Sequence, residues 1–83
     1  MQSGFAYHFS RHARNRMRMW RLTPDQVIAV VESPARATID EDGYWMVWEG
    51  HTEPTIRVTY TVEESTIVII SAVIVGMQHR PPR

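Results

Sequence analysis

The chain has 83 residues and no formal net charge, because nine arginines balance nine acidic residues. A chain of this length is expected to form one small domain. The balanced charge argues against a generally basic nucleic-acid-binding protein, although every charged residue before Asp25 is an arginine. The sequence contains no cysteine, which excludes disulfides and thiolate metal sites, and we expect no cofactor.

Signals for secretion or membrane insertion are not found in the sequence. The N-terminus lacks the continuous apolar segment of a signal peptide. The apolar run at 66–75 is too short to cross a bilayer as a helix. We therefore expect a soluble cytoplasmic protein with no membrane contact.

The pattern begins with a short strand and a helix. Alternating aromatic residues predict the strand at Phe5–Phe9. The helix is expected at Ser10–Trp20 and ends near Arg21, with Ser10 as its N-cap. Ala13, Met17 and Trp20 recur at i, i+4 and i+7 and form its apolar stripe.

The same helix carries two groups of polar side chains. Four arginines share one face, which we call the arginine ridge: Arg11, Arg14, Arg18 and Arg21. Such a face is usually solvated, but it is also a candidate surface for RNA or an acidic partner. His12 and Arg16 lie one turn apart beside the apolar stripe, so we expect them where the helix meets its packing partner.

A second helix is expected from Pro24 to about Glu32. Thr23 is the predicted N-cap and Gln26 completes a capping box. The dipeptide 33–34 ends this helix, because a residue before proline disfavours the helical conformation. Three residues supply its expected buried face: Val27, Ile28 and Val31.

The remainder of the chain alternates with the two-residue period of strands. Strands are expected at 35–40, 44–49, 55–63 and 66–75. The clearest alternation lies in the third of these. It directs one set of side chains to one face, namely Ile56, Val58, Tyr60 and Val62, and a second set to the other, namely Arg57, Thr59 and Thr61.

These elements predict an α+β domain in two layers. A short N-terminal strand and two helices are expected to pack on a four-stranded antiparallel sheet. The core of the domain is expected at about 5–76, followed by an exposed tail at 77–83.

Two segments of the chain resemble the DUF4258 family. The first segment is similar to the family's opening motif. It reads Ser10-x-His12-Ala13-x-x-Arg16-Met17, followed by Arg21-x-Thr23, Val27, Val31 and Pro34. The second segment is similar to the later half of the family and consists of Arg57-Val58-x-Tyr60 and the apolar last strand. The resemblance implies a fold like that of the RelE and ParE toxins, which are ribonuclease-type or gyrase-directed components of toxin–antitoxin pairs. RNA and an antitoxin-like protein are then the candidate partners.

Cleavage of RNA requires a base, an acid and cations that stabilise the charge developing on the phosphate. For proton transfer we predict His12 or His79, because histidine titrates near neutral pH. Arg16 and Arg57 are the predicted phosphate ligands. The leading hypothesis is therefore a RelE-like toxin-type endoribonuclease or RNA-binding protein.

Each of these side chains also has a structural interpretation. His12 is suited to a hydrogen bond at the helix–sheet seam, and Arg16 to an ion pair with Glu32 or Glu49. Arg57 lies on an open face if the helices cover the opposite one, unless it simply opposes a cross-strand acid. Three aromatic residues are typical core residues, with base stacking as the alternative: Tyr44, Trp45 and Trp48. A metal site at His8 and His12 lacks further ligands, and we expect none.

The last strand has more apolar residues than one packed face requires. We expect the second face of Ile67–Val75 to contact another chain, either a copy of this protein or an antitoxin-like partner. Alternatively, the N-terminal strand and the tail cover it. The rival hypothesis for function is a non-catalytic protein-interaction module that uses the sheet and the arginine ridge.

Overall fold

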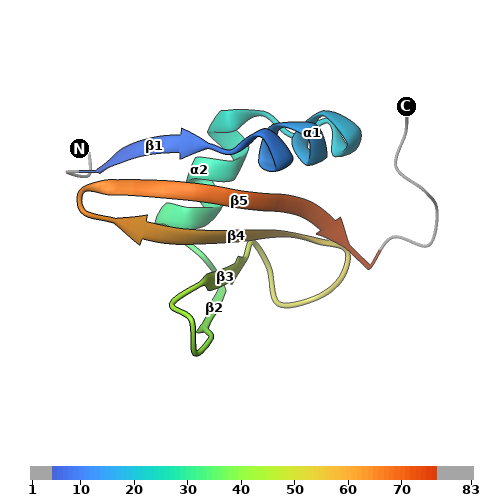
Figure 1. The fold of residues 1–83 in the computed structure, drawn as a ribbon. Helices are drawn as coiled ribbons and strands as arrows, with labels where there is room; N and C mark the ends of the chain where they lie inside the picture. The colour runs from blue at the N-terminus through green and yellow to red at the C-terminus, as the bar shows by residue number, and fades with distance from the viewer. Residues whose placement is uncertain (1–4, 77–83) are drawn as a thin grey trace.

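Two helices lie against one face of a five-stranded sheet in the computed structural model, which describes residues 5–76 (Figure 1). In Figure 1, α2 lies behind β4 and β5. The expected tail at 77–83 lies outside the described residues. The elements are, in chain order, β1 (Ala6–Phe9), α1 (Arg11–Trp20), α2 (Pro24–Glu32), β2 (Arg36–Ile39), β3 (Trp45–Trp48), β4 (Thr55–Glu63) and β5 (Thr66–Val75).

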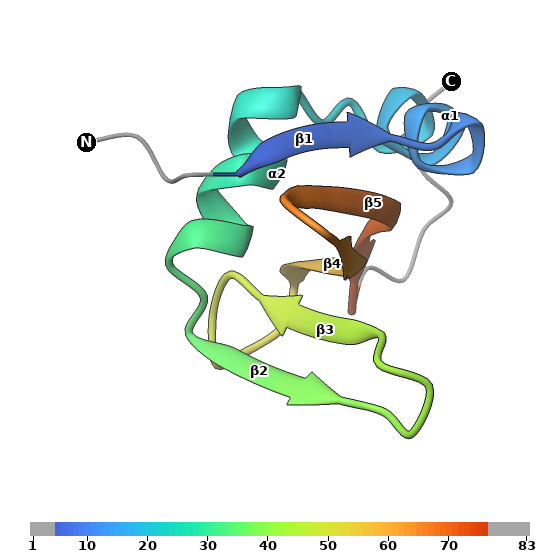
Figure 2. The ribbon, with the colours of Figure 1, turned by 60° about the vertical axis from the view of Figure 1, so that its left-hand side comes forward.

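The sheet is mixed, and its strand order is β1-β5-β4-β3-β2 (Figure 2). Strands β2 to β5 form the expected antiparallel meander. The prediction of a four-stranded antiparallel sheet was incomplete, because β1 joins as a fifth strand parallel to β5, with Phe9 opposite Ile69. β5 is therefore paired along both edges and packed under the helices. This central position explains its apolar composition.

Local sequence signals place the helix boundaries. The Ser10 hydroxyl oxygen accepts the Ala13 N–H at 3.0 Å and donates to the Ile70 carbonyl at 3.3 Å, so the start of α1 is tied to β5. Thr23 and Gln26 form the expected capping box at the start of α2. Caps of this kind contribute about 1 kcal/mol each. No helix within residues 5–76 is long and apolar enough to span a bilayer.

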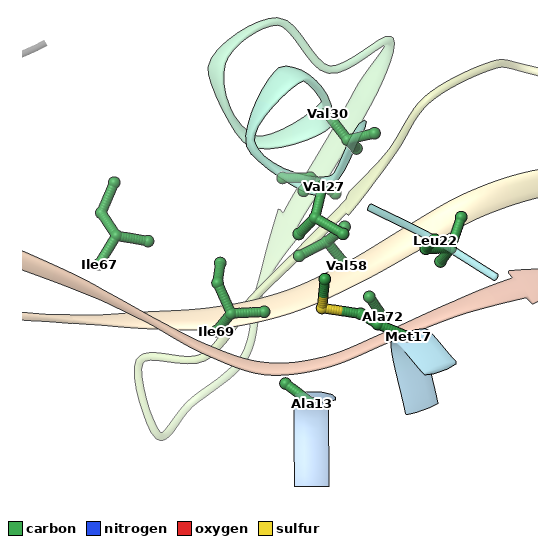
Figure 3. Close-up of a cluster of buried hydrophobic side chains, with 10 residues drawn as sticks. Ala13, Met17, Leu22, Val27, Val30, Val58, Ile67, Ile69 and Ala72 are labelled. Atoms are coloured by element: carbon green, nitrogen blue, oxygen red, sulfur yellow. The ribbon is translucent and has the colours of Figure 1, made fainter. Parts of the chain in front are cut away.

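The core fills the space between the helices and one face of the sheet (Figure 3). Ala13 and Met17 of α1 pack with β5, and α2 packs on β4 and β3. On α2 the predicted buried face was partly wrong. Val27 and Val30 are buried, whereas Ile28 and Val31 are only half-buried. Positions 27 and 30 are three apart and share one side of a helix.

A β-bulge adjusts β5 to its partner β4. Thr59 lies opposite Ser71 and Tyr60 lies opposite Ile69, so Ile70 is an extra residue in β5. Before the bulge the buried side chains of β5 are Ile67 and Ile69, and after it the buried side chain is Ala72. The bulge thus keeps apolar residues under the helices although the simple alternation is interrupted.

Candidate nucleic-acid interface

The sheet face turned away from the helices carries the side chains that alternate with the core residues. Val58 is fully buried against the helices, so its neighbour Arg57 lies on the opposite face. The helices do cover the face of Ile56 and Tyr60, both of which pack against the core. The condition under which Arg57 was predicted to lie on an open face is therefore met.

Register places four side chains in one row across this open face. Arg57 of β4 has Trp48 of β3 on one side and Val73 of β5 on the other. Trp48 in turn lies opposite Arg36 of β2. We call this set the arginine–tryptophan row: Arg36, Trp48, Arg57 and Val73. Neither cross-strand neighbour of Arg57 is acidic, so the interpretation in which Arg57 opposes a cross-strand acid is wrong.

The two arginines of the row differ in their surroundings. The guanidinium carbon of Arg36 lies 4.4 Å from the centroid of the Trp48 ring, a cation–π geometry. Arg57 is half-buried, and its Nε is buried with no hydrogen-bond acceptor among residues 5–76. A buried charged donor with no acceptor costs about 1–3 kcal/mol or more. Because this Nε has almost no exposed surface, an anionic ligand on this face would supply the missing acceptor after a shift of the Arg57 side chain.

The aromatic residues of β3 separate into two roles. Trp45 lies opposite Tyr60, and their rings stack with centroids 6.2 Å apart and an interplanar angle of 11°. Burial of Tyr60 raises its pKa above the ordinary value, because the ionised phenol is poorly solvated there. Trp45 and Tyr60 therefore serve the packed face. Trp48 is the aromatic residue of β3 that lies on the open face.

All four side chains of the arginine ridge are exposed. Three of them lie on α1, whereas Arg21 is the left-handed C-cap residue and does not continue the helix face as predicted. The first turn of α1 contains no acid. Within residues 5–76, none of Arg11, Arg14 and Arg18 forms an ion pair with an acidic side chain. Arg11, Arg14 and Arg18 are therefore a source of uncompensated positive charge.

The other predicted catalytic residues are not gathered around Arg57. His12 is exposed on α1 and not at the helix–sheet seam, so that placement was wrong. Arg16 is half-buried, and its Nη1 lies 3.8 Å from the Met19 sulfur. No hydrogen bond among the described side chains links His12 or Arg16 to Arg57. His79 lies outside the described residues.

The proposed structural partners of Arg16 are also not observed. Glu32 accepts a hydrogen bond from the Tyr7 hydroxyl at 3.3 Å. Within the described part of the chain, neither Glu32 nor Glu49 forms an ion pair with Arg16. Among residues 5–76, only the weak contact with the Met19 sulfur holds the Arg16 guanidinium, and its other donors make no hydrogen bond there.

Other clefts and clusters are less suited to an anion. A cleft of about 690 Å³ beside β1 is lined by His8 together with Glu63 and Glu64, whose charges repel phosphate. Across residues 5–76, no three histidine or acidic side chains lie close enough together to hold a metal ion. His8 and His12 are carried by different elements, β1 and α1. The arginine–tryptophan row is the stronger candidate.

Sequence reasoning missed the role of Arg36. Its strand was predicted, and alternation places Arg36 and Thr38 on one face, but the pairing of Arg36 with Trp48 depends on the hairpin register. Comparisons of the chain with protein-family models, curated proteins and solved structures find no match. The resemblance to DUF4258 therefore stays a prediction.

Proposed function

We propose that the protein is a RelE-like domain that binds RNA on the open face of its sheet, as the toxin-type component of a toxin–antitoxin pair. The observation that carries the proposal is the buried Arg57 Nε, which has no acceptor in the described part of the chain. It lies next to Trp48 on a face that neither α1 nor α2 covers. After a shift of the Arg57 side chain that exposes this buried donor, a bound phosphate oxygen would satisfy it in a site of reduced dielectric.

RNA fits this row better than a simple anion does. Arginine binds phosphate through several N–H groups, and Trp48 offers a ring on which a base can stack. Single-stranded RNA exposes both groups at once, whereas paired bases are not free to stack on protein. The arginine ridge would attract the polyanion over a longer range and make binding depend on salt.

The element order supports a RelE-like architecture. Both helices follow β1, lie on one face of the sheet, and precede an antiparallel meander. This arrangement is consistent with the fold implied by the resemblance to the DUF4258 family. The proposal includes a cytoplasmic location, where messenger RNA is translated.

Cleavage is the second step of the proposal. His12 or His79 would transfer the proton, as the sequence predicts. Arg16 and Arg57 would contact different phosphates of one strand, because α1 and Arg57 lie on opposite sides of the sheet. The exposed position of His12 keeps its imidazole accessible to a substrate. Its separation from the row means that a bound RNA strand would have to contact both α1 and the open face.

Binding is tested by titrating a fluorescent single-stranded RNA and measuring its anisotropy. We expect Arg57→Met to lower the affinity about 10- to 100-fold, because a charge-assisted hydrogen bond is lost. Arg14→Met removes the same charge from the ridge. It should lower the affinity less and reduce the dependence on salt by about one phosphate contact. Equal losses in the two variants would contradict a specific site at Arg57.

Cleavage is tested by expressing the protein in bacteria and comparing it with an Arg16→Ala/Arg57→Ala variant of matched solubility. We expect the unmodified protein to slow growth and fragment transcripts, and the variant to do neither. Equal growth and intact transcripts with both proteins would exclude the toxin. If RNA binding in vitro persists, the protein is an RNA-binding domain without ribonuclease activity.

The rival function is a non-catalytic protein-interaction module. The observation that favours it is the separation of His12 from Arg57, since no acid–base pair is assembled among residues 5–76. Failure of the anisotropy and growth experiments together would leave this as the supported function.

A further inference from the structure

We propose that the free edge of β2 pairs antiparallel with β2 of a second copy of the chain, so that two sheets become one. β2 lies at the end of the sheet, with no element beyond it in either ribbon view (Figures 1 and 2). All four of its residues are exposed, and the Ile39 side chain is 53% exposed. This inference does not depend on RNA binding.

The hairpin geometry shows which backbone groups are available at this edge. Asp40 and Tyr44 lie opposite each other, and the Asp40 N–H donates to the Tyr44 carbonyl at 3.0 Å. In an antiparallel ladder, alternate residues direct their N–H and C=O groups to the same neighbour. Thr38 therefore bonds toward β3, whereas Ala37 and Ile39 direct their backbone groups to the free edge.

One register uses all of these groups. With Thr38 on a two-fold axis, Ala37 lies opposite Ile39 of the second copy, and both can exchange N–H···O=C bonds. The same register places Arg36 opposite Asp40 of the second copy, twice in the dimer. Because those two positions form non-hydrogen-bonded pairs, their side chains approach closely.

Charge complementarity favours this partner over others. In the Asp40 carboxylate, Oδ1 accepts the N–H groups of Asp42 and Tyr44, both at 2.9 Å. Its second oxygen makes no hydrogen bond within residues 5–76 and is available to the guanidinium of Arg36. The opposite edge of the sheet, β1, contains no acid within Ala6–Phe9 and lacks such a match.

The symmetry has a consequence for the open face. A two-fold axis perpendicular to the sheet keeps the open faces of both copies on the same side. The two arginine–tryptophan rows would then lie on one continuous surface. Because each strand is short, the contact is small, and we expect a weak dimer that forms at high protein concentration.

Disulfide trapping tests the register directly, since the chain has no cysteine of its own. At a non-hydrogen-bonded pair on the axis, two cysteines have the Cα separation that a disulfide requires. We expect Thr38→Cys to form disulfide-linked dimers severalfold faster than Thr52→Cys, a control in an exposed loop. Equal rates in the two variants would overturn the proposal.

A second substitution, made in the Thr38→Cys variant, distinguishes strand pairing from random collision. In the proposed register Ile39 lies opposite Ala37 of the second copy, and the two copies of position 39 are diagonal neighbours across the two-fold axis on the covered face. Ile39→Lys therefore places two positive charges near each other in the dimer and should slow the trapping of Thr38→Cys severalfold. The matched control is Val62→Lys, because Val62 is 43% exposed but lies on β4. If Ile39→Lys and Val62→Lys act equally, β2 does not pair with itself.

Discussion

The two faces of the sheet differ in how completely their side chains are buried and paired. On the covered face, Val47, Val58 and Ile69 are almost completely buried against the helices. On the open face, the neighbouring positions carry Trp48 and Arg57, which no helix or strand of the described residues covers. Successive residues of a strand point to opposite faces, so each of these strands contributes to both environments.

This difference separates stability from binding within single strands. Close packing on the covered face leaves little room for change without loss of stability. The buried Arg57 Nε, which has no acceptor within residues 5–76, does the reverse, because it costs stability and becomes a strong donor for a ligand once the side chain shifts. Substitutions on the covered face are therefore expected to lower stability, whereas substitutions at adjacent open-face positions are expected to lower ligand binding instead.

The largest contrast is expected between adjacent residues of β5. Ile69 is fully buried, so Ile69→Ala should lower the free energy of unfolding by about 2–5 kcal/mol. Val68 is half-buried on the open face, and Val68→Ala should cost much less. Urea denaturation monitored by circular dichroism measures both. Similar losses would show that the open face is packed as tightly as the covered one.

Most of the fold was predictable from the sequence because local signals decide it. Ser10 and Thr23 are caps with clear residue patterns, and the bounds of β4 follow from its alternation. The addition of β1 to the sheet was not predictable by the same means. Parallel pairing with β5 is a contact between segments about 60 residues apart, and no local pattern specifies it.

The candidate site was predictable only in part, for a related reason. Alternation placed Arg57 opposite the apolar face, which needs only the period of one strand. Its proximity to Trp48 and Arg36 depends on the registers of two hairpins. The prediction that His12 lies at the helix–sheet seam was wrong. Helical spacing gives the direction of His12 relative to the apolar stripe of α1, but it does not give the width of the surface that α1 buries.

A crossed pair of tryptophan substitutions sharpens the comparison between faces. Trp45→Leu removes the stack with Tyr60, and should lower the free energy of unfolding by about 1 kcal/mol beyond the lost buried area. Trp48→Leu removes the contact with Arg36, worth about 0.5–1 kcal/mol. In the anisotropy assay we expect the reverse order, with Trp48→Leu binding RNA more weakly. The same order in both assays would mean that Trp48 is only structural.

A smaller change in stability is expected at Arg57. Arg57→Met keeps an apolar stem between Trp48 and Val73 and removes the donor that lacks an acceptor. We expect the free energy of unfolding to stay unchanged or to rise by about 1 kcal/mol. Chemical denaturation without RNA gives this value. A clear loss of stability would mean that Arg57 has a structural role, and the proposed site would lose its main support.

The smallest expected effect concerns pH and tests the covered face. Burial raises the pKa of Tyr60 above 10.0, so the folded protein keeps this proton at a pH where the unfolded chain releases it. Its contribution to stability is therefore fully present below pH 10 and is lost as the pH rises through the folded-state pKa. We expect the free energy of unfolding to fall less between pH 9 and pH 11 in Tyr60→Phe than in the unmodified protein. Tyr7 and Tyr44 are present in both proteins and cancel in this difference, and the chain has no lysine that titrates in this range. Identical pH dependence would mean that the Tyr60 phenol is in water. The covered face would then not extend to the pair of Trp45 and Tyr60.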